Sequence, residues 1–376
     1  MANKSHIQPI TKLRIKGFKS IQDQTIPLNH ANVLLGANGA GKTNLLSVFN
    51  LLGNVLRKGL SLSTVCMSLP QVFYQGEETT SSLEIEVFFA NSTSYGFTLI
   101  PKNGFGLKIQ QEYISKNGQY TYLQNANGAE SVWETEVHEK HLYAILFDLS
   151  RVRCYDLSRI SSKGDAVFSQ IPNGDRVLYG GMGNLPSFLF LLEAKYPKEF
   201  KRIEQTISVV EPSFDGFCLK AETGSIDPHT VSLKWREKGT GAVLPPFYLS
   251  DGTLRFIGLM TLLMMPEDIR PSVILLDNPD LYLDDLSLNI LGESLQGVQR
   301  TSPDTQIIVA THSTTLIDFF SPEDVVVAER GPKGSLFSKP DPIFCKGLLA
   351  ENFSLGELWR KNVLGGHSRK AFPMQE

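Results

Sequence analysis

The sequence predicts an α/β fold with a mixed central sheet, an antiparallel β subdomain and an inserted helical lobe. Short apolar strands alternate with amphipathic helices at the start of the chain and again after residue 245. Between these regions, residues 83–123 hold short strands separated by Asn-Gly and Asn-Ser turns, as antiparallel hairpins do. Residues 185–210 carry apolar side chains at helical spacing, with Pro197 placed to divide them into two helices.

The spacing of the apolar residues predicts the strands and helices one after another along the chain. Residues 12–16 alternate with period two and predict a half-exposed strand, and residues 33–35 predict a short buried strand. A helical pattern runs from Asn44 to Leu56. The remaining predictions are antiparallel strands at 83–87, 95–100, 105–111 and 120–123 with Lys-Asn-Gly turns at 102–104 and 116–118, strands at 217–221, 231–235, 273–276, 306–310 and 324–328, and helices at 252–265, 285–299, 314–320 and 355–359.

Composition excludes several classes of protein. Of the 376 residues, 41% are hydrophobic, which is too many for a disordered or fibrous chain. The 36 Lys and Arg against 39 Asp and Glu give a net charge of −3, whereas a dedicated nucleic-acid wrapper is usually basic. The longest apolar run, residues 256–265, is shorter than the roughly 20 residues of a membrane span. We therefore expect a cytoplasmic protein with no membrane partner.

The cysteines predict neither a zinc site nor a disulfide framework. They lie far apart in the chain, and no two of them form a C-x-x-C pair. Reduced thiols in the cytoplasm are the simple interpretation. The four residues are Cys66, Cys154, Cys218 and Cys345.

Residues 36–43, Gly-Ala-Asn-Gly-Ala-Gly-Lys-Thr, fit the phosphate-binding spacing G-x-x-x-x-G-K-[ST]. Glycines let backbone amides face an anion, and the following helix adds free amides and its positive dipole end. Lys42 would neutralise the β- and γ-phosphates, and the Thr43 hydroxyl would complete the shell of a Mg²⁺ ion. A Gly-rich turn without a ligand is the alternative, but the strand before it and the helix after it favour a phosphate site. The expected nucleotide contacts are Asn38, Gly39, Ala40, Gly41, Lys42, Thr43 and Asn44.

A second strand end supplies a carboxylate. Residues 273–276 are apolar and lead to Asp277, which would hold the same Mg²⁺ ion. The next residue is Asn278, where ATPases of this type commonly carry a Glu that polarises the attacking water. Asn cannot accept a proton, and loss of a general base costs about 10²–10⁴ in rate. Hydrolysis is then slow, unless Asp280 or Asp284 substitutes for the base or Asn278 orients the water by itself.

The strand predicted at 306–310 leads to His312, where the sheet edge should meet a γ-phosphate. A lone His is more often structural, but at a strand end of a P-loop protein we favour γ-phosphate sensing. Asp277, Asn278 and His312 are therefore the candidate catalytic residues.

Three further segments carry a family resemblance. Residues 13–20 (Leu-Arg-Ile-Lys-Gly-Phe-Lys-Ser), 248–255 (Tyr-Leu-Ser-Asp-Gly-Thr-Leu-Arg) and 311–313 (Thr-His-Ser) resemble ABC-type ATPase heads of the RecF, OLD-like and structural-maintenance-of-chromosomes (SMC) group. Order and spacing match over about residues 10–60 and 245–330. The resemblance implies a P-loop NTPase of ABC-ATPase type that uses ATP and Mg²⁺.

The same resemblance implies partners and a mode of action. Such heads form ATP-sandwiched homodimers, in which Ser250, Asp251 and Gly252 would reach the nucleotide of the other subunit. An N-cap Ser followed by a turn Gly is the plainer reading of these residues and is compatible with that role. The usual Glu-Glu-Pro-Glu run reads Asp-Asn-Pro-Asp at 277–280, and Asp284 stands where a His is usual, so turnover rather than nucleotide binding is affected.

These observations lead to expectations for domains and function. Small relatives of this kind often stand beside a separate effector in bacterial anti-phage systems, so we expect a slow nucleotide switch that controls an effector. A RecF-like DNA-binding ATPase of repair is the alternative, with Lys12, Arg14, Lys16 and a basic tail as DNA contacts; a transporter subunit fits poorly. No Toprim domain is expected after residue 330. The expected division is a nucleotide-binding core at 1–60 and 215–340, an antiparallel β subdomain at 61–150, a helical lobe at 151–214, and a C-terminal helix and tail at 341–376.

Overall fold

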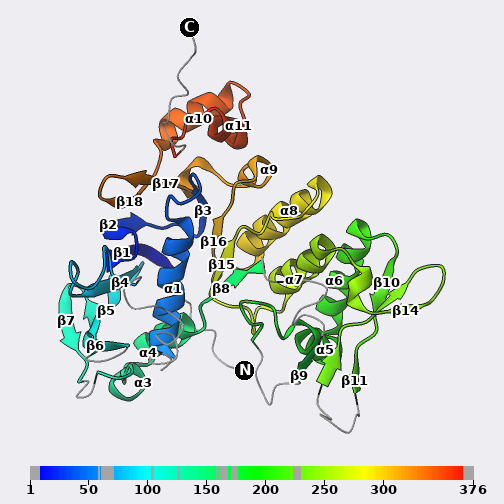
Figure 1. Cartoon of the computed structure of the whole chain (residues 1–376), viewed down its shortest axis with the longest axis horizontal. Coiled ribbons are helices and arrows are strands. Elements are labelled where there is room, and N and C mark those ends of the chain that lie inside the picture. Colours follow the sequence, from blue (N-terminus) through cyan, green and yellow to red (C-terminus); the bar gives the residue numbers. More distant parts are fainter. Residues whose placement is uncertain are drawn as a thin grey trace. The chain divides into compact units, whose positions relative to one another are not determined.

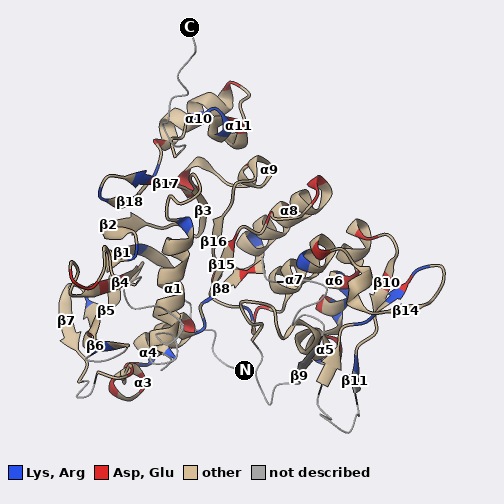
Figure 2. Cartoon of the chain, viewed as in Figure 1, with Lys and Arg blue, Asp and Glu red and all other residues tan. Residues whose placement is uncertain are grey.

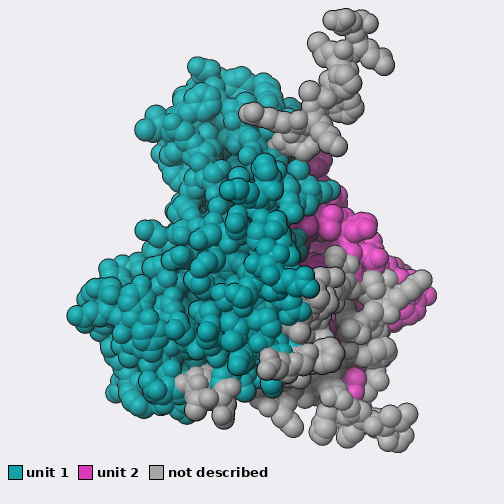
Figure 3. Space-filling view, turned by 60° about the vertical axis from the view of Figure 1, so that its left-hand side comes forward, with its two compact units in different colours: residues 1–154, 272–275, 304–376 teal, residues 155–271, 276–303 magenta. Residues whose placement is uncertain are grey.

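The computed structural model describes most of the chain (Figure 1). Contacts between Cα atoms divide the chain into two compact units, coloured separately in Figure 3. Unit 1 holds residues 1–154, 272–275 and 304–376, and unit 2 holds residues 155–271 and 276–303. The described residues are 9–57, 60, 72–102, 106–124, 128–157, 160, 168–170, 177–222 and 230–366.

The period-two pattern near the start of the chain forms one strand of an antiparallel sheet in unit 1. Leu13 and Ile15 are fully buried on one face of β1 (Ile10–Phe18), and the basic residues that alternate with them, Lys12, Arg14 and Lys16, lie on the other face. The strand order is β2-β1-β4-β5-β6-β7, which confirms the predicted antiparallel region. The other strands are β2 (Ile21–Pro27), β4 (Leu83–Phe89), β5 (Thr93–Pro101), β6 (Leu107–Lys116) and β7 (Gln119–Tyr122).

One of the two predicted Lys-Asn-Gly hairpin turns is confirmed. Asn117 and Gly118 join β6 to β7, with φ values of 51° and 80°. Positive φ at both central residues suits the twist of a two-residue hairpin, and Asn followed by Gly tolerates it. The turn predicted at 102–104 lies outside the described residues beyond Lys102.

The continuous apolar strands form a second sheet, which holds the phosphate-binding loop. β3 (Ala31–Leu35) and β16 (Gln306–Ala310) each have five consecutive buried residues, as a strand covered on both faces requires. β3 runs parallel to β16 and to β17 (Val325–Gly331), whereas β18 (Gly334–Ser338) runs antiparallel to β17. The sheet is therefore mixed, as predicted. Its order is β18-β17-β3-β16-β15-β8, with β15 at Val273–Asp277 and β8 at Arg153–Asp156.

Helix α1 (Lys42–Leu56) supplies the core of unit 1. One buried cluster includes Leu13 of β1, Phe49 of α1 and Ile308 of β16, so the helix shares a core with both sheets. Burying Phe49 alone contributes roughly 1.5–3 kcal/mol. Trp133 belongs to the same cluster, and its indole N–H donates to the carbonyl of Leu56 over 2.8 Å. Trp133 begins α3 (Trp133–Glu136), which precedes α4 (Lys140–Ser150).

Unit 2 is mainly helical. The predicted division at Pro197 is confirmed, because Pro197 is the first residue of α6 and suits the first turn of a helix. Two small sheets of order β10-β13-β14 and β11-β12-β9 accompany the helices. The helices are α5 (Leu185–Lys195), α6 (Pro197–Val210), η4 (Pro246–Tyr248), α7 (Asp251–Met264) and α8 (Asp285–Thr301).

The strands predicted at 217–221 and 231–235 are wrong as single elements. The first segment is interrupted at residues 218–219 and the second at residues 233–234. Each segment therefore contributes to both small sheets, since β10 pairs with β13 while β11 pairs with β12. Between them, the amide of Cys218 donates to the carbonyl of Lys234, so the break falls at the same level on both segments. The strands are β9 (Phe168–Gln170), β10 (Phe214–Phe217), β11 (Lys220–Glu222), β12 (Thr230–Ser232), β13 (Trp235–Glu237) and β14 (Val243–Leu244).

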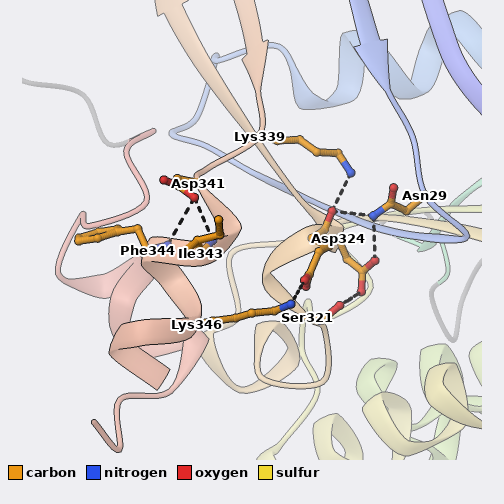
Figure 4. A network of polar contacts seen from close by, with 9 residues as sticks. Asn29, Ser321, Asp324, Lys339, Asp341, Ile343, Phe344 and Lys346 are labelled. Atoms are coloured by element: carbon orange, nitrogen blue, oxygen red, sulfur yellow. Dashed lines mark hydrogen bonds and ion pairs between the residues drawn. The ribbon is translucent and has the colours of Figure 1, made fainter. Parts of the chain in front are cut away.

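A further correction concerns the end of the chain. The helix predicted at 314–320 is shorter, since α9 spans Thr314–Ile317 and is soon followed by the Pro-initiated η5 (Pro322–Asp324). A helix that the sequence did not predict, α10 (Pro342–Ala350), is attached to η5 by an ion pair between Lys346 and Glu323. Figure 4 shows Lys346 near Asn29 and Lys339, which both donate to the carbonyl of the same Glu323. The predicted helix at 355–359 is α11 (Leu355–Arg360).

Among the described residues, the helices lack the combined length and apolar character that a membrane crossing requires. The sequence also predicts a functional division of the chain, with a nucleotide-binding core at 1–60 and 215–340. The two compact units are defined by contacts and not by function, so this functional division stays a prediction.

Candidate functional site

The predicted phosphate loop connects β3 to α1 in unit 1. Gly39 and Gly41 adopt left-handed conformations, with φ values of 76° and 116°. A Cβ at Gly41 would lie 2.2 Å from Oγ of Ser335, so this position requires glycine. Gly41 is the N-cap residue of α1, and no side chain of the described residues caps the helix there. The first-turn amides are thus placed at the loop, where an anion would be favoured.

Lys42 is held inside this loop. Its side chain is only 6% exposed, and Nζ donates to the carbonyl of Gly36 over 2.7 Å and to that of Ala37 over 3.2 Å. Nζ also lies 2.9 Å from Nε2 of His312, a residue 270 positions away. An ammonium group can only donate, so Nε2 is the acceptor and the imidazole proton resides on Nδ1. The structure thus brings together the predicted phosphate-binding Lys and the predicted sensing His.

A cavity that the sequence did not predict adjoins the N-terminus of α1. Its volume is about 670 Å³. The side-chain amide of Asn44 donates to Oγ of Ser20, whose hydroxyl lies 2.7 Å from that of Ser335. Burial lowers the pKa of Lys19, whose Nζ donates to Oγ of Ser47 over 3.0 Å. The lining residues are Lys19, Ser20, Asn44, Phe73, Gln75, Gly76 and Arg330.

Only some of the residues that line this cavity belong to motifs that the sequence shows. Lys19 and Ser20 belong to the segment that carries the family resemblance, and Asn44 was a predicted nucleotide contact. Gln75 and Arg330 come from distant loops and strands with no motif of their own, so only the folded chain could identify them.

Asp277 and Asn278 lie together in unit 2. Asp277 ends β15 and is 9% exposed. The Asn278 side chain turns toward it, because Nδ2 donates to Oδ1 of Asp277 over 3.0 Å. Asp284 caps α8 by accepting from the amide of Ser287 over 2.8 Å. Hydrogen bonds from Ser287 lower the pKa of Asp284, which makes this carboxylate a weaker base than usual.

The predicted signature residues also lie in unit 2, at the start of α7. Ser250 is the N-cap, and its Oγ accepts from the amide of Thr253 over 2.9 Å. A Cβ at Gly252 would lie 2.3 Å from the carbonyl oxygen of Tyr282, so only glycine fits against this loop. Tyr282 itself has a φ of 66°, which is strained for an aromatic residue, and its ring centroid lies 4.1 Å from Cζ of Arg255. Asp251 is exposed in the first turn of the helix.

The chemistry of two predicted ligands suits Mg²⁺. Within the described parts of the chain, no group of three or more His, Cys, Asp or Glu residues could hold a metal. Mg²⁺ at a P-loop needs no such cluster, since it keeps several waters and uses phosphate oxygens. The hydroxyl of Thr43 and the carboxylate of Asp277 are oxygen ligands of the right kind. Their placement on one ion stays a prediction.

Three of the basic residues considered for DNA binding, Arg14, Lys16 and Arg360, have acidic neighbours. Lys16 forms an ion pair with Glu84 over 2.8 Å, and Arg14 lies 4.0 Å from Asp23. Figure 2 shows basic and acidic residues on the strands of this sheet. In the tail, Arg360 lies 4.0 Å from Glu357 and Lys361 lies over the ring of Phe353. Arg369 and Lys370 lie outside the described residues.

Comparisons with known proteins agree with this architecture. A family model described as the RecF/RecN/SMC N-terminal domain matches residues 9–329. No curated protein matches significantly. Among solved structures, an SMC head bound to the C-winged helix domain of ScpA is 16% identical, with 88% of this chain and 97% of that chain covered and a TM-score of 0.57.

Two further Smc heads are similar as well. The Smc head domain of Pyrococcus furiosus with an extended coiled coil, bound to the C-terminal domain of ScpA, is 14% identical, with coverage of 91% and 99% and a TM-score of 0.52. The Smc head domain of Pyrococcus yayanosii with a coiled coil and joint is 14% identical, with coverage of 91% and 99% and a TM-score of 0.51. At such identities the likeness concerns the fold, and it confirms the predicted ABC-type P-loop class.

Proposed function

The chain belongs to the RecF/RecN/SMC N-terminal domain family and is an ABC-type ATPase, and on this premise we propose that it is a slow ATP-driven switch. In this proposal ATP and Mg²⁺ join two copies of the chain, and the closed dimer controls a partner effector in the cytoplasm. The assignment to bacterial anti-phage defence rests on the resemblance to the OLD-like group seen in the sequence.

The contact between Lys42 and His312 carries the proposal. A buried ammonium at a helix N-terminus needs an anionic partner to offset the cost of its desolvation. Here the loop carbonyls and His312 hold it in position. A triphosphate entering the loop would meet Lys42, the α1 amides and His312 as one connected group. This arrangement favours a nucleotide whose terminal phosphate contacts His312.

The remaining parts of the nucleotide also have candidate partners. The cavity of about 670 Å³ beside Asn44 and Ser20 falls within the range of roughly 300–1,000 Å³ that suits small ligands. We assign it to the nucleoside. Thr43, with Asp277, would hold Mg²⁺, which supplies charge neutralisation of the β- and γ-phosphates when bound.

Dimerisation is supported by the surface around the signature residues. Phe247 and Tyr248, which directly precede the signature, are 58% and 63% exposed, and their ring centroids lie 4.8 Å apart. Tyr282, which contacts Gly252 and Arg255, is 73% exposed. Exposed aromatic side chains gathered near a polar motif are typical of a protein–protein interface. We propose that this surface faces the second copy.

The effector is proposed as a protein. Two of the similar solved heads are bound to a domain of ScpA, so a head of this fold can carry a partner protein. The alternative, a RecF-like DNA-binding ATPase, depends on a positive surface. Because Lys16 and Arg14 have acidic neighbours, that surface is weaker than the sequence suggested. We therefore place control of an effector first.

The test combines binding and mass. Calorimetry should detect association of MgATP with the wild-type chain, and light scattering should show a shift from one protomer to two. Lys42→Ala should abolish both signals, whereas Ser250→Arg should abolish only the mass shift; Lys198→Ala, an exposed lysine of α6, is the control. The absence of a heat of association with wild-type protein would overturn the proposal. Retention on duplex DNA with a steep salt dependence would favour the alternative.

A further inference from the structure

The segment that follows α11 returns to the phosphate loop. The carbonyl of Gly366 accepts a hydrogen bond from the amide of Ala37 over 2.9 Å. The amide of Gly366 donates to Oε1 of Glu329 over 2.8 Å. We propose that Gly365, Gly366 and Glu329 form a latch that positions the phosphate loop for ATP. The inference rests on the proposed nucleotide site and concerns its regulation.

The two glycines are required by geometry. Gly365 and Gly366 have φ values of 82° and 84°, in the left-handed region that glycine enters without strain. A Cβ at Gly366 would lie 2.8 Å from Cγ1 of Val327 and 3.0 Å from the ring of Trp359. The backbone can therefore approach both the β17 strand and the loop only without a side chain at this position.

The segment at residues 354–366 also packs against the helix that follows His312. Helix α9 begins at Thr314, two residues after His312, and α11 packs against it. The amide of Gly356 donates to Oδ1 of Asp318 over 2.6 Å, and a Cβ at Gly356 would lie 2.4 Å from the carbonyl oxygen of Thr314. Trp359 of α11 then contacts Gly366. Residues 354–366 thus connect α9 to the phosphate loop.

Lys42 lies between these two points of attachment. Its Nζ donates to the carbonyl of Ala37, the residue whose amide donates to Gly366 of the latch. The same Nζ lies beside Nε2 of His312, which precedes α9. Loosening the latch should therefore disturb the position of the loop relative to His312. ATP should be affected more than ADP, because only ATP carries the γ-phosphate that His312 is proposed to read. A purely structural segment would change stability without changing the preference for ATP.

Two pairs of variants test the latch. Glu329→Ala removes the acceptor for Gly366, whereas Glu329→Gln keeps a carbonyl oxygen there, and the side chain is exposed, so neither should unfold the chain. Gly366→Ala introduces the clash with Val327, and Gly347→Ala on α10, with nothing within 4 Å of a new Cβ, is its control. Affinities for MgATP and MgADP are measured by calorimetry, and melting temperatures without nucleotide.

We expect Glu329→Ala and Gly366→Ala to weaken MgATP about 5- to 10-fold, as the loss of one hydrogen bond to a positioned loop implies. MgADP affinity should change less than about 2-fold, and Glu329→Gln and Gly347→Ala should bind as the wild type does. Equal changes for ATP and ADP, or unchanged ATP affinity in Glu329→Ala, would overturn the latch. Wild-type protein that binds neither nucleotide would overturn the proposed function as well, which separates the two failures.

Discussion

The side-chain amide of Asn278 donates a hydrogen bond to Oδ1 of Asp277 over 3.0 Å. Asn278 has a φ of 47°, in the left-handed region that asparagine tolerates better than most residues. Its amide is therefore engaged with the expected metal ligand, and an amide cannot take a proton from water. Of the two substitute bases, Asp284 is committed to capping α8.

From this contact we expect turnover below about one per second, and we expect Asn278→Glu to raise it at least about tenfold, since a general base contributes about 10²–10⁴. Part of the gain is offset because a left-handed backbone costs a Glu roughly 1–2 kcal/mol. Phosphate release under saturating MgATP is the measurement. Asn278→Gln is the matched control of equal length without a base. Fast wild-type hydrolysis, or an equal gain with Gln, would refute this role of Asn278.

His312→Ala should lower turnover by about 10- to 100-fold with little change in KM, because Nζ of Lys42 loses its contact with Nε2 and the proposed sensor of the γ-phosphate is absent. Steady-state kinetics over a range of MgATP concentrations separates kcat from KM. His138→Ala, an exposed His of the same unit, is the control. Wild-type kcat in His312→Ala would leave His312 with a structural role only.

Glu112→Ala should destabilise unit 1 by about 3 kcal/mol, because removing the carboxylate leaves buried hydrogen-bond donors without an acceptor. Glu112 is 1% exposed and accepts from Oη of Tyr95 over 2.7 Å, from the hydroxyl of Ser131 and from the amide of Val132. Burial and this carboxylate raise the pKa of Tyr95. Denaturant unfolding measures the change, with Lys108→Ala on the same strand expected within about 0.5 kcal/mol of wild type. Equal stabilities of the two variants would contradict the prediction.

Asp148 should make stability depend on pH. Burial raises its pKa to about 6, with a further contribution from Asp304. A carboxyl whose folded pKa is raised adds stability below its unfolded pKa of about 3.9, and this stability is lost as pH rises through about 6. Asp148→Asn should therefore flatten the change in unfolding free energy between about pH 4 and 6 and increase stability at pH 7. An unchanged pH profile in the variant would contradict this assignment.

The local elements of the site could be predicted from the sequence. A buried strand, a Gly-rich loop with the P-loop spacing and a helix of period 3.6 each depend on residues within a few positions of each other. The order of β3, the loop and α1 is therefore predicted correctly from the sequence. The hairpin at 116–118 and the break at Pro197 were likewise fixed by the conformations of Asn-Gly and Pro.

Contacts between distant segments could not be predicted in this way. Apolar runs at 217–221 and 231–235 resemble single strands, and only the pairing of β10 with β13 and of β11 with β12 divides them. The basic face of β1 is a sequence pattern, but its neutralisation by Glu84 depends on the register with β4. The cavity beside Ser20 needed Gln75 and Arg330 to arrive from elsewhere in the chain.

By itself, then, the sequence determined the strand, the glycine-rich loop and the helix that form the proposed phosphate site, because loop spacing, glycine conformation and helix periodicity act over a few residues. Only the tertiary structure decided that Lys42 meets His312 across 270 positions and that Gly366 closes on Ala37. Such contacts follow from burying both sheets against α1 in one core, a free-energy balance of the whole chain that no local pattern contains.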